Sequence, residues 1–85
     1  MSDVTLDFGK KLREARRSAG LTQAQVARRM RIHQSYVSRV ERGLENPTLE
    51  SCLNFATAVG YGFEPSRGFV PLNELDPDLG DLPLS

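Results

Sequence analysis

The stretch TQAQVARRMRIHQSYVSRVERG, residues 22–43, decides the fold of this chain. Within it, Ala27 is followed ten residues later by Val37 and thirteen residues later by Val40. A small side chain at the first of these positions lets a second helix pack closely against the first across a short turn. The spacing therefore predicts two short helices joined by a tight turn.

Local signals set the ends of these two helices. Thr22 and Gln25 fit a capping box, in which each side chain satisfies a backbone N–H group at the helix start. Gly43 is a typical stop for the second helix, because glycine readily adopts the left-handed conformation that ends helices. The first helix is expected to end near Met30 or Arg31, and the second to run from His33 or Gln34 to Arg42.

A further helix is expected on each side of this pair. The preceding one would be capped by Thr5 or Asp7 and end at Gly20, and the following one would be capped by Thr48 and end at Gly60. Helical spacing predicts the inward faces to be Phe8, Leu12, Ala15 and Ala19 in the former and Leu49, Leu53, Ala56 and Val59 in the latter.

Beyond these helices the pattern changes. YGFEPSRGFV, residues 61–70, alternates aromatic residues around a Pro-Ser-Arg-Gly turn signal, which predicts a short strand or hairpin over 61–72. The last stretch, 73–85, is rich in Pro and Asp with isolated leucines, a composition typical of disorder. The fold is thus expected to be an all-α, compact bundle of four to five helices over residues 5–60, with a strand-like and partly disordered C-terminal extension.

Charge is divided sharply along the chain, although the net charge is zero. Ten of the eleven basic residues lie within residues 10–42, where the acids are Glu14 and Glu41. Residues 43–85 hold Arg67 and seven acidic residues. This asymmetry indicates a polyanion-binding half joined to an acidic half.

Several functional classes are disfavoured by what the sequence lacks. No run approaches the roughly 18 apolar residues of a membrane span, and the start lacks the layout of a signal peptide, so a cytoplasmic location without a membrane partner is expected. Cys52 is a single cysteine in an apolar segment and is expected to be buried core. The chain has no nucleophile with a His and a carboxylate, no metal-ligand cluster and no phosphate-cradling glycine loop. We therefore expect no enzymatic activity, no metal and no cofactor.

The second helix of the central pair has two distinct faces on a wheel of about 100° per residue. Leu44 joins Val37 and Val40 on one side. The other side carries short hydroxyl groups and long guanidinium groups without an acid, and it consists of Ser35, Ser38, Arg39 and Arg42, with Gln34 at the exposed end. Arg can donate two hydrogen bonds to guanine O6 and N7, and Gln can pair with adenine N6 and N7. The alternative is a merely solvated helix face, which would more commonly mix Glu and Lys.

Spacing and surface chemistry together predict a helix-turn-helix, in which the second helix enters the major groove of DNA and the first lies across the backbone. The sequences LREARRSAGLTQAQVARRM (12–30), YVSRVERG (36–43) and NPTLESC (46–52) resemble the Xre family, the lambda-repressor-like and Cro-like helix-turn-helix DNA-binding proteins. The resemblance covers residues 8–60 and implies a lambda-repressor-like bundle whose third helix is the recognition element.

Roles for individual residues follow from this resemblance and from the charge pattern. The resemblance pairs Arg16 with Glu41 as an ion pair between the first and third helices, the alternative being a free surface carboxylate. Base reading is expected from Gln34, Ser35, Ser38 and Arg39. Phosphate binding is expected from Gln23, Arg28, Arg29, Arg31, His33, Arg42 and Thr48.

Two positions depart from the family pattern. Arg31 stands where a glycine commonly lies in the turn, so a residue with a side chain is expected to adopt a left-handed conformation. His33 stands where Ser or Thr usually caps the third helix, and it is a poorer cap.

The leading hypothesis is a sequence-specific transcriptional regulator, a repressor that binds double-stranded DNA as a homodimer on an inverted repeat. The dimer or partner surface is expected at Tyr61, Phe63, Phe69 and Val70, since so small a core would not bury all of them. An alternative is a HipB-like antitoxin of a type II toxin-antitoxin module, which represses its own operon and binds a toxin through its C-terminal region. Small restriction-modification controller proteins are a further class that the chain resembles.

Overall fold

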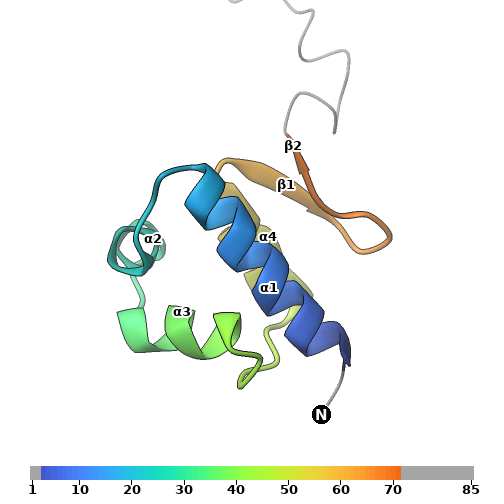
Figure 1. The fold of residues 1–85 in the computed structure, drawn as a ribbon, viewed down its shortest axis with the longest axis horizontal. Coiled ribbons are helices and arrows are strands. Elements are labelled where there is room, and N and C mark those ends of the chain that lie inside the picture. Colours follow the sequence, from blue (N-terminus) through green and yellow to red (C-terminus); the bar gives the residue numbers. More distant parts are fainter. Residues whose placement is uncertain (1–2, 72–85) are drawn as a thin grey trace, which may run out of the picture.

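The computed structural model describes residues 3–71, so the predicted tail over 73–85 lies outside the described residues. Within these residues the chain forms four helices followed by a hairpin (Figure 1). The elements are α1 (Asp3–Ser18), α2 (Gln23–Met30), α3 (Gln34–Glu41), α4 (Leu49–Ala58), β1 (Tyr61–Glu64) and β2 (Gly68–Pro71). The expected helical bundle with a strand-like extension is confirmed. Within residues 3–71 no helix combines the length and the apolar character needed to cross a membrane.

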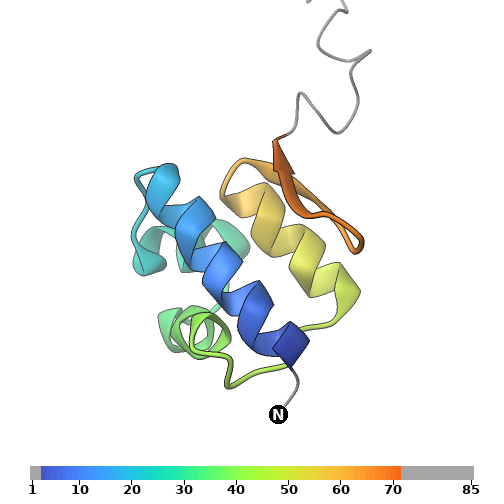
Figure 2. The same ribbon diagram turned by 45° about the vertical axis from the view of Figure 1, so that its right-hand side comes forward.

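Helix α1 runs through the middle of the molecule. Figure 1 shows α2 and α3 on one side of α1 and the hairpin on the other, and Figure 2 shows α4 alongside α1. Contacts join α1 to α3 and to β2, while α4 packs against α2 and β1. The α2–α3 pair is therefore held from one side by α1 and α4, which leaves its other side open to solvent.

The core lies where these helices meet. Its fully enclosed side chains include Leu12, Val26, Val37, Val40 and Phe55. Ala27 of α2 is also buried, at 4% exposure, and it belongs to the same core cluster as Val37 and Val40 of α3. Burial raises the pKa of the Cys52 thiol, which forms part of this core as expected.

Helix α1 approaches the end of α3 unusually closely at Gly9. A Cβ atom at this position would lie 2.4 Å from the Val40 carbonyl oxygen and 2.8 Å from the Glu41 carbonyl oxygen. Real Cβ atoms do not come so near to backbone oxygens, so a side chain here would push the two helices apart. Glycine is thus required at this point by packing.

The predicted caps of the second and fourth helices are present. The Thr22 hydroxyl accepts a hydrogen bond from the Gln25 N–H at 3.1 Å, and the Gln25 side chain accepts one from the Thr22 N–H at 2.8 Å. The Thr48 hydroxyl accepts from the Ser51 N–H at 3.1 Å at the start of α4. Both caps could be predicted from the sequence because each joins residues that are only three apart.

The expected start of α1 is wrong. The helix begins at Asp3, so Thr5 and Asp7 lie within it and do not cap it. No proline or glycine separates Asp3 from Asp7, so the sequence does not interrupt the helix over these residues. The helix ends at Ser18, so Ala19 has left the helical spacing and is exposed.

Three leucines that were expected to face inward are exposed. Leu49 and Leu53 on α4 are 54% and 43% exposed, and Leu44 is 47% exposed. Helix α3 ends at Glu41, so the wheel that placed Leu44 beside the buried valines does not extend to it. The buried face of α4 consists of Cys52, Phe55, Ala56 and Ala58, with Val59 at its end.

The hairpin is a two-stranded antiparallel sheet in which Phe63 pairs with Phe69 and Gly62 pairs with Val70. A tight turn joins the strands, with the Arg67 N–H donating to the Glu64 carbonyl at 3.0 Å and Gly68 at φ 79°. This is the three-residue connection in which a left-handed residue follows a turn.

The apolar side of the hairpin packs on the helices. The Phe8 ring lies 5.6 Å from the Phe63 ring and 5.3 Å from the Phe69 ring, and Tyr61 is also partly buried against the core. Val70 is 1% exposed. The expectation that the core cannot bury these residues is therefore wrong for Val70. Tyr61, Phe63 and Phe69 are partly buried, because the hairpin packs on the core of its own chain.

Candidate nucleic-acid interface

The turn between α2 and α3 sets the angle of the third helix. Arg31 ends α2 in the left-handed conformation, at φ 58° and ψ 45°, as expected from the absence of a glycine there. The Arg31 N–H donates to the Arg28 carbonyl at 3.2 Å, and the Ile32 N–H donates to the Ala27 carbonyl at 3.0 Å. His33 then occupies the N-cap of α3 without a capping hydrogen bond from its side chain, also as expected.

Helix α3 presents the predicted polar face to solvent. Val37 and Val40 are fully buried, whereas Gln34, Ser35 and Arg39 are exposed and Ser38 is half-buried. Amide, hydroxyl and guanidinium groups on one helix face can meet the donors and acceptors of base edges, since short hydroxyls allow close approach and longer groups reach further.

Glu41, the acid of α3, lies at the centre of a buried polar cluster, with its side chain 0% exposed. The Arg16 Nε and Nη2 atoms donate to its two carboxylate oxygens at 2.6 Å and 3.0 Å. The Gln23 amide donates to the same carboxylate at 3.1 Å, and Arg13 Nε lies 3.6 Å from it. Arg16 Nη1 also donates to the Leu21 carbonyl at 2.9 Å, so the cluster joins α1, α2 and α3.

Two opposing effects act on the pKa of Glu41. Burial raises this pKa, but hydrogen bonds from Arg16 and Gln23 and the nearby charges of Arg16 and Arg13 outweigh burial, so that the pKa lies below its ordinary value. The hydrogen bond to Glu41 correspondingly raises the pKa of Arg16. The carboxylate therefore stays ionised, and its charge is compensated inside the protein.

The residues expected to bind phosphate fall into two groups. Arg28, Arg31, His33 and Arg42 are exposed: Arg28 lies in the last turn of α2, Arg31 and His33 lie between α2 and α3, and Arg42 directly follows α3. The remaining three, Gln23, Arg29 and Thr48, have partners within the chain. Thr48 caps α4, and its hydroxyl also donates to the Ser51 hydroxyl at 3.2 Å.

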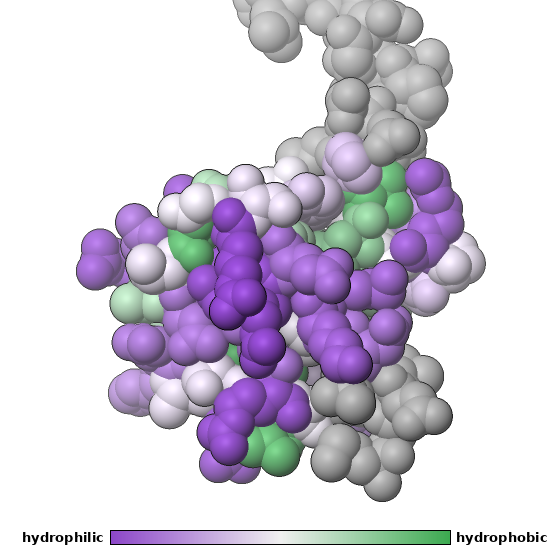
Figure 3. All heavy atoms as spheres, in the orientation of Figure 1, coloured by the Kyte–Doolittle hydropathy of each residue, from purple (hydrophilic) through white to green (hydrophobic). Residues whose placement is uncertain are grey.

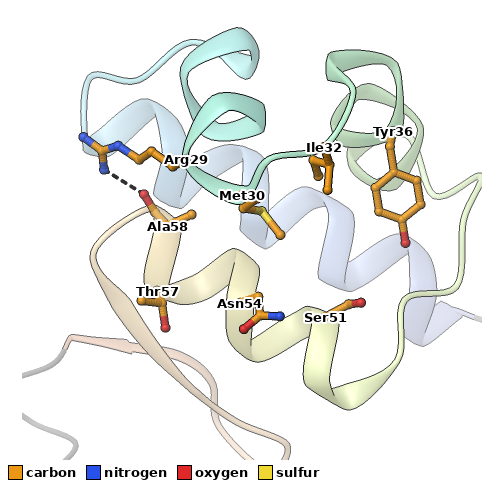
Figure 4. A pocket seen from close by; sticks show the side chains of 8 residues that line it. All are labelled: Arg29, Met30, Ile32, Tyr36, Ser51, Asn54, Thr57 and Ala58. Carbon is orange, nitrogen blue, oxygen red and sulfur yellow. Dashed lines mark hydrogen bonds between the residues drawn. The ribbon is translucent and has the colours of Figure 1, made fainter.

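Arg29 connects α2 to the end of α4. Its Nη1 donates to the Ala58 carbonyl at 2.8 Å, a contact drawn in Figure 4. Beside this contact lies an open cavity of about 550 Å³ between α2 and α4. Its lining residues are Arg29, Met30, Ile32, Tyr36, Ser51, Asn54, Thr57 and Ala58, so it includes none of the four side chains expected to read bases.

An ion pair on the surface joins Arg39 to Glu45 in the loop after α3. Arg39 Nε donates to Glu45 Oε1 at 2.8 Å, with the two side chains 55% and 31% exposed. Burial raises the pKa of Tyr36, and the negative charge of Glu45 adds to this rise. Sequence reasoning missed this pair, because the partners are six residues apart on either side of a helix end and follow no helical spacing.

The charge of the helical half is mostly cationic at the surface. Residues 10–42 hold ten basic residues and two acids, Glu14, which is exposed, and Glu41, which is enclosed by arginines. In the view of Figure 3, hydrophilic side chains cover the helical part of the molecule, while hydrophobic residues gather beside the hairpin. A surface with this charge attracts polyanions.

Comparison with known proteins gives three informative matches. A family model described as a helix-turn-helix domain matches residues 7–66. The uncharacterized HTH-type transcriptional regulator y4dJ of Sinorhizobium fredii (strain NBRC 101917 / NGR234) is 40% identical over 58 residues, covering 68% of this chain and 75% of that protein. The crystal structure of the restriction-modification controller protein C.AhdI from Aeromonas hydrophila is 42% identical, with a TM-score of 0.61, over 65% of this chain and 83% of that one.

The clp gene regulator ClgR from C. glutamicum is more distant. It is 22% identical, covers 87% of this chain and 83% of its own, and has a TM-score of 0.68. At this identity the likeness is one of fold.

Proposed function

Since the chain belongs to the Xre-type helix-turn-helix family of DNA-binding transcriptional regulators, we propose that it represses transcription by binding a specific inverted-repeat operator as a dimer. The observation that carries this proposal is the outer face of α3. Gln34, Ser35 and Arg39 are exposed there, while the acid of the same helix, Glu41, is fully buried and neutralised by arginines. Such a face can approach DNA without exposing a negative charge of its own.

Base reading is assigned to Gln34, Ser35, Ser38 and Arg39. Gln34 is the first residue of α3, where its amide can reach furthest into a groove. Arg39 lies in the last turn and is suited to guanine, which offers two acceptors to one guanidinium. Ser35 and Ser38 are short and would let the helix backbone come close to the bases.

Phosphate binding is assigned first to Arg28, Arg31, His33 and Arg42, whose exposed side chains lie around α3. Gln23 can serve as well, because its amide has two N–H donors and uses one of them on Glu41. Arg29 is a weaker candidate, since it is bound to the carbonyl at the end of α4. At Thr48 the hydroxyl is already used by the cap, so a phosphate there would be held by the backbone N–H groups of α4.

We propose that dimers form through the outer face of α4 and not primarily through the hairpin. Leu49 and Leu53 lie one turn apart on α4 and are among the large apolar side chains exposed in the described part of the chain. Exposed leucines on one helix face suit self-association, whereas Val70 is enclosed in its own chain. A two-fold dimer would present two recognition helices to two half-sites about one DNA turn apart.

Of the two more specific hypotheses, the controller type is favoured by the 42% identity to C.AhdI, a restriction-modification controller protein. The antitoxin hypothesis assigned toxin binding to the C-terminal region, of which residues 73–85 lie outside the described residues, and no comparison supports a toxin partner. Genes for a restriction enzyme and its methyltransferase beside this gene would support the controller type, and a toxin gene there would support the antitoxin.

The assignment of base-reading and phosphate-binding residues is tested by two arginine variants. Operators are first selected from a random DNA pool with the wild-type protein. Arg39→Ala should lose discrimination of roughly 1–3 kcal/mol at one base pair in each half-site. Arg28→Ala should weaken binding to all sequences alike and reduce the slope of log affinity against log salt by about 1. If the selection yields no preferred sequence, the proposed function is wrong.

A further inference from the structure

We propose that Glu45 is a positioning residue for base recognition, which orients Arg39 toward a guanine edge and thereby raises specificity at some loss of affinity. The inference rests on the proposed function, because it concerns the same recognition helix. Its starting point is the 2.8 Å hydrogen bond from Arg39 Nε to Glu45 Oε1. An isolated surface ion pair is usually too weak to fix a side chain. The Arg39–Glu45 pair is held in place by the loop that carries Glu45.

The backbone brings Glu45 back to Arg39. Gly43 adopts the left-handed conformation at φ 74°, and its N–H donates to the Val40 carbonyl at 3.0 Å. The Leu44 N–H donates at 2.8 Å to the carbonyl of Arg39 itself. These two bonds form the helix-ending arrangement in which the chain folds back over the last turn. Glu45 follows Leu44 directly, so its carboxylate lies beside the side chain of Arg39, the residue whose carbonyl accepts the Leu44 hydrogen bond.

The other end of this loop is also fixed. Thr48 caps α4 two residues after Asn46, with its hydroxyl accepting from the Ser51 N–H at 3.1 Å. The segment carrying Glu45 is therefore short and held at both ends. Glu45 is half-buried, at 31% side-chain exposure, which further restricts its movement.

The geometry of the pair leaves Arg39 free to recognise a base. The hydrogen bond uses Nε, while a guanidinium has four further N–H donors on its two Nη atoms. Guanine presents two acceptors, O6 and N7, which two of these donors can meet together. Because the guanidinium is held by Nε, Arg39 loses less conformational freedom when it binds DNA. Glu45 therefore lowers the entropic cost of the contact between Arg39 and guanine.

The negative charge of Glu45 also lowers the affinity for DNA. Close to DNA a carboxylate repels phosphate, and this repulsion weakens binding to every site. At a guanine the oriented Arg39 offsets the repulsion by its paired hydrogen bonds, whereas at another base the repulsion remains. This repulsion is the same at every sequence, so it lowers affinity without changing the preference among bases, and the preference comes from the contact of the oriented Arg39 with guanine.

The test compares Glu45→Gln with Glu50→Gln, which removes the same charge from an exposed acid in the first turn of α4. Affinities are measured for the operator selected with the wild-type protein and for operators in which each guanine of the half-site is replaced. Thermal unfolding of both variants should stay close to that of the wild type, since Glu50 is exposed and a partly exposed ion pair such as Arg39–Glu45 contributes little to stability.

Both variants should bind all DNA more tightly, because each has lost a negative charge. Glu45→Gln alone should reduce the preference for guanine at one position of each half-site by about threefold or more, as part of the roughly five- to hundredfold discrimination of a paired Arg–guanine contact. In an Arg39→Ala background, Glu45→Gln should leave the base preference unchanged.

The two levels of the hypothesis fail in different ways. If the wild type selects a guanine-containing operator but Glu45→Gln keeps the full preference, as Glu50→Gln does, Glu45 acts only as a charge and this inference is wrong while the proposed function stands. If the wild type shows no preference for any sequence, the proposed function itself fails.

Discussion

At the scale of single residues, the Glu41 carboxylate shows how a charge can be carried inside so small a core. It is fully enclosed, yet each of its oxygens accepts a hydrogen bond from Arg16, and Gln23 adds a third. Removing two charges from water is costly, and only such complete pairing compensates for it. The cluster ties three helices together, so it orients α3 as well as stabilising it.

Replacing Glu41 by Gln should therefore destabilise the protein by about 3–5 kcal/mol, because Arg16 would be left buried with an uncompensated charge. Urea unfolding followed by circular dichroism would measure the change. Glu14→Gln, which alters an exposed acid on α1, should change the free energy of unfolding by no more than about 0.5 kcal/mol. Equal effects of the two substitutions would show that the buried cluster does not stabilise the fold.

The same carboxylate predicts how stability depends on pH. Its pKa in the folded protein lies below the ordinary value of 4.5. A lowered folded pKa contributes stability that is fully present above the unfolded pKa and is lost as pH falls through the folded pKa. The free energy of unfolding should thus decline below about pH 4.5, and the decline should be shallower in Glu41→Gln than in the wild type. Parallel declines in both proteins would contradict this assignment.

At the scale of elements, the capped starts of α2 and α4 were predictable, whereas the buried face of α4 was not. The caps at Thr22 and Thr48 depend on contacts three residues apart, which the sequence displays directly. The buried face of α4 was predicted wrongly because this helix is apolar around most of its circumference. Helical spacing fits both the Leu49 and Leu53 side and the Phe55 side, and packing against α2 and the hairpin selects the latter.

The polar contacts of the candidate interface also include some that could be predicted from the sequence and some that could not. The outer face of α3 and the pairing of Arg16 with Glu41 could be expected from spacing and from family resemblance. The contacts of Arg39 with Glu45 and of Arg29 with the Ala58 carbonyl could not, because they depend on how a loop and a distant helix end fold back in three dimensions.

The turn between α2 and α3 carries the next prediction. Arg31 is the residue with a side chain that adopts positive φ in the described part of the chain, and this conformation costs roughly 1–2 kcal/mol for a residue other than glycine. Arg31→Gly should relieve this strain, less the roughly 0.5–1 kcal/mol of added chain entropy, and so raise the free energy of unfolding by up to about 1 kcal/mol.

The same substitution should weaken DNA binding, because it removes a cation near α3. Arg31→Ala is the matched control, since it removes the charge equally but keeps a side chain in the strained conformation. Both variants should lose affinity and reduce the salt slope by about 1, and only the glycine variant should gain stability. A gain in the alanine variant as well would contradict the account of strain.

At the scale of the whole molecule, the chain separates two surfaces. Cations surround α3, whereas the exposed leucines lie on α4 and in the loop before it. The hairpin, which covers Phe8 and contributes Val70 to the core, enlarges a domain that would otherwise be small for independent stability. With the hairpin used in this way, the exposed leucines of α4 are the surface to which we assign the proposed dimer.

A charge introduced on that face should separate the dimer. Leu53→Glu should shift the protein to monomers in sedimentation velocity experiments, because two like charges would oppose each other across a two-fold interface. Asn54→Glu places the same charge on the next residue, which faces the cavity between α2 and α4, and it should remain dimeric. Affinity for an inverted repeat should fall by about a hundredfold or more in Leu53→Glu, since the second half-site no longer gains from the first. Binding to a single half-site should be alike in both variants and in the wild type, and if Leu53→Glu remains a dimer, the interface lies elsewhere.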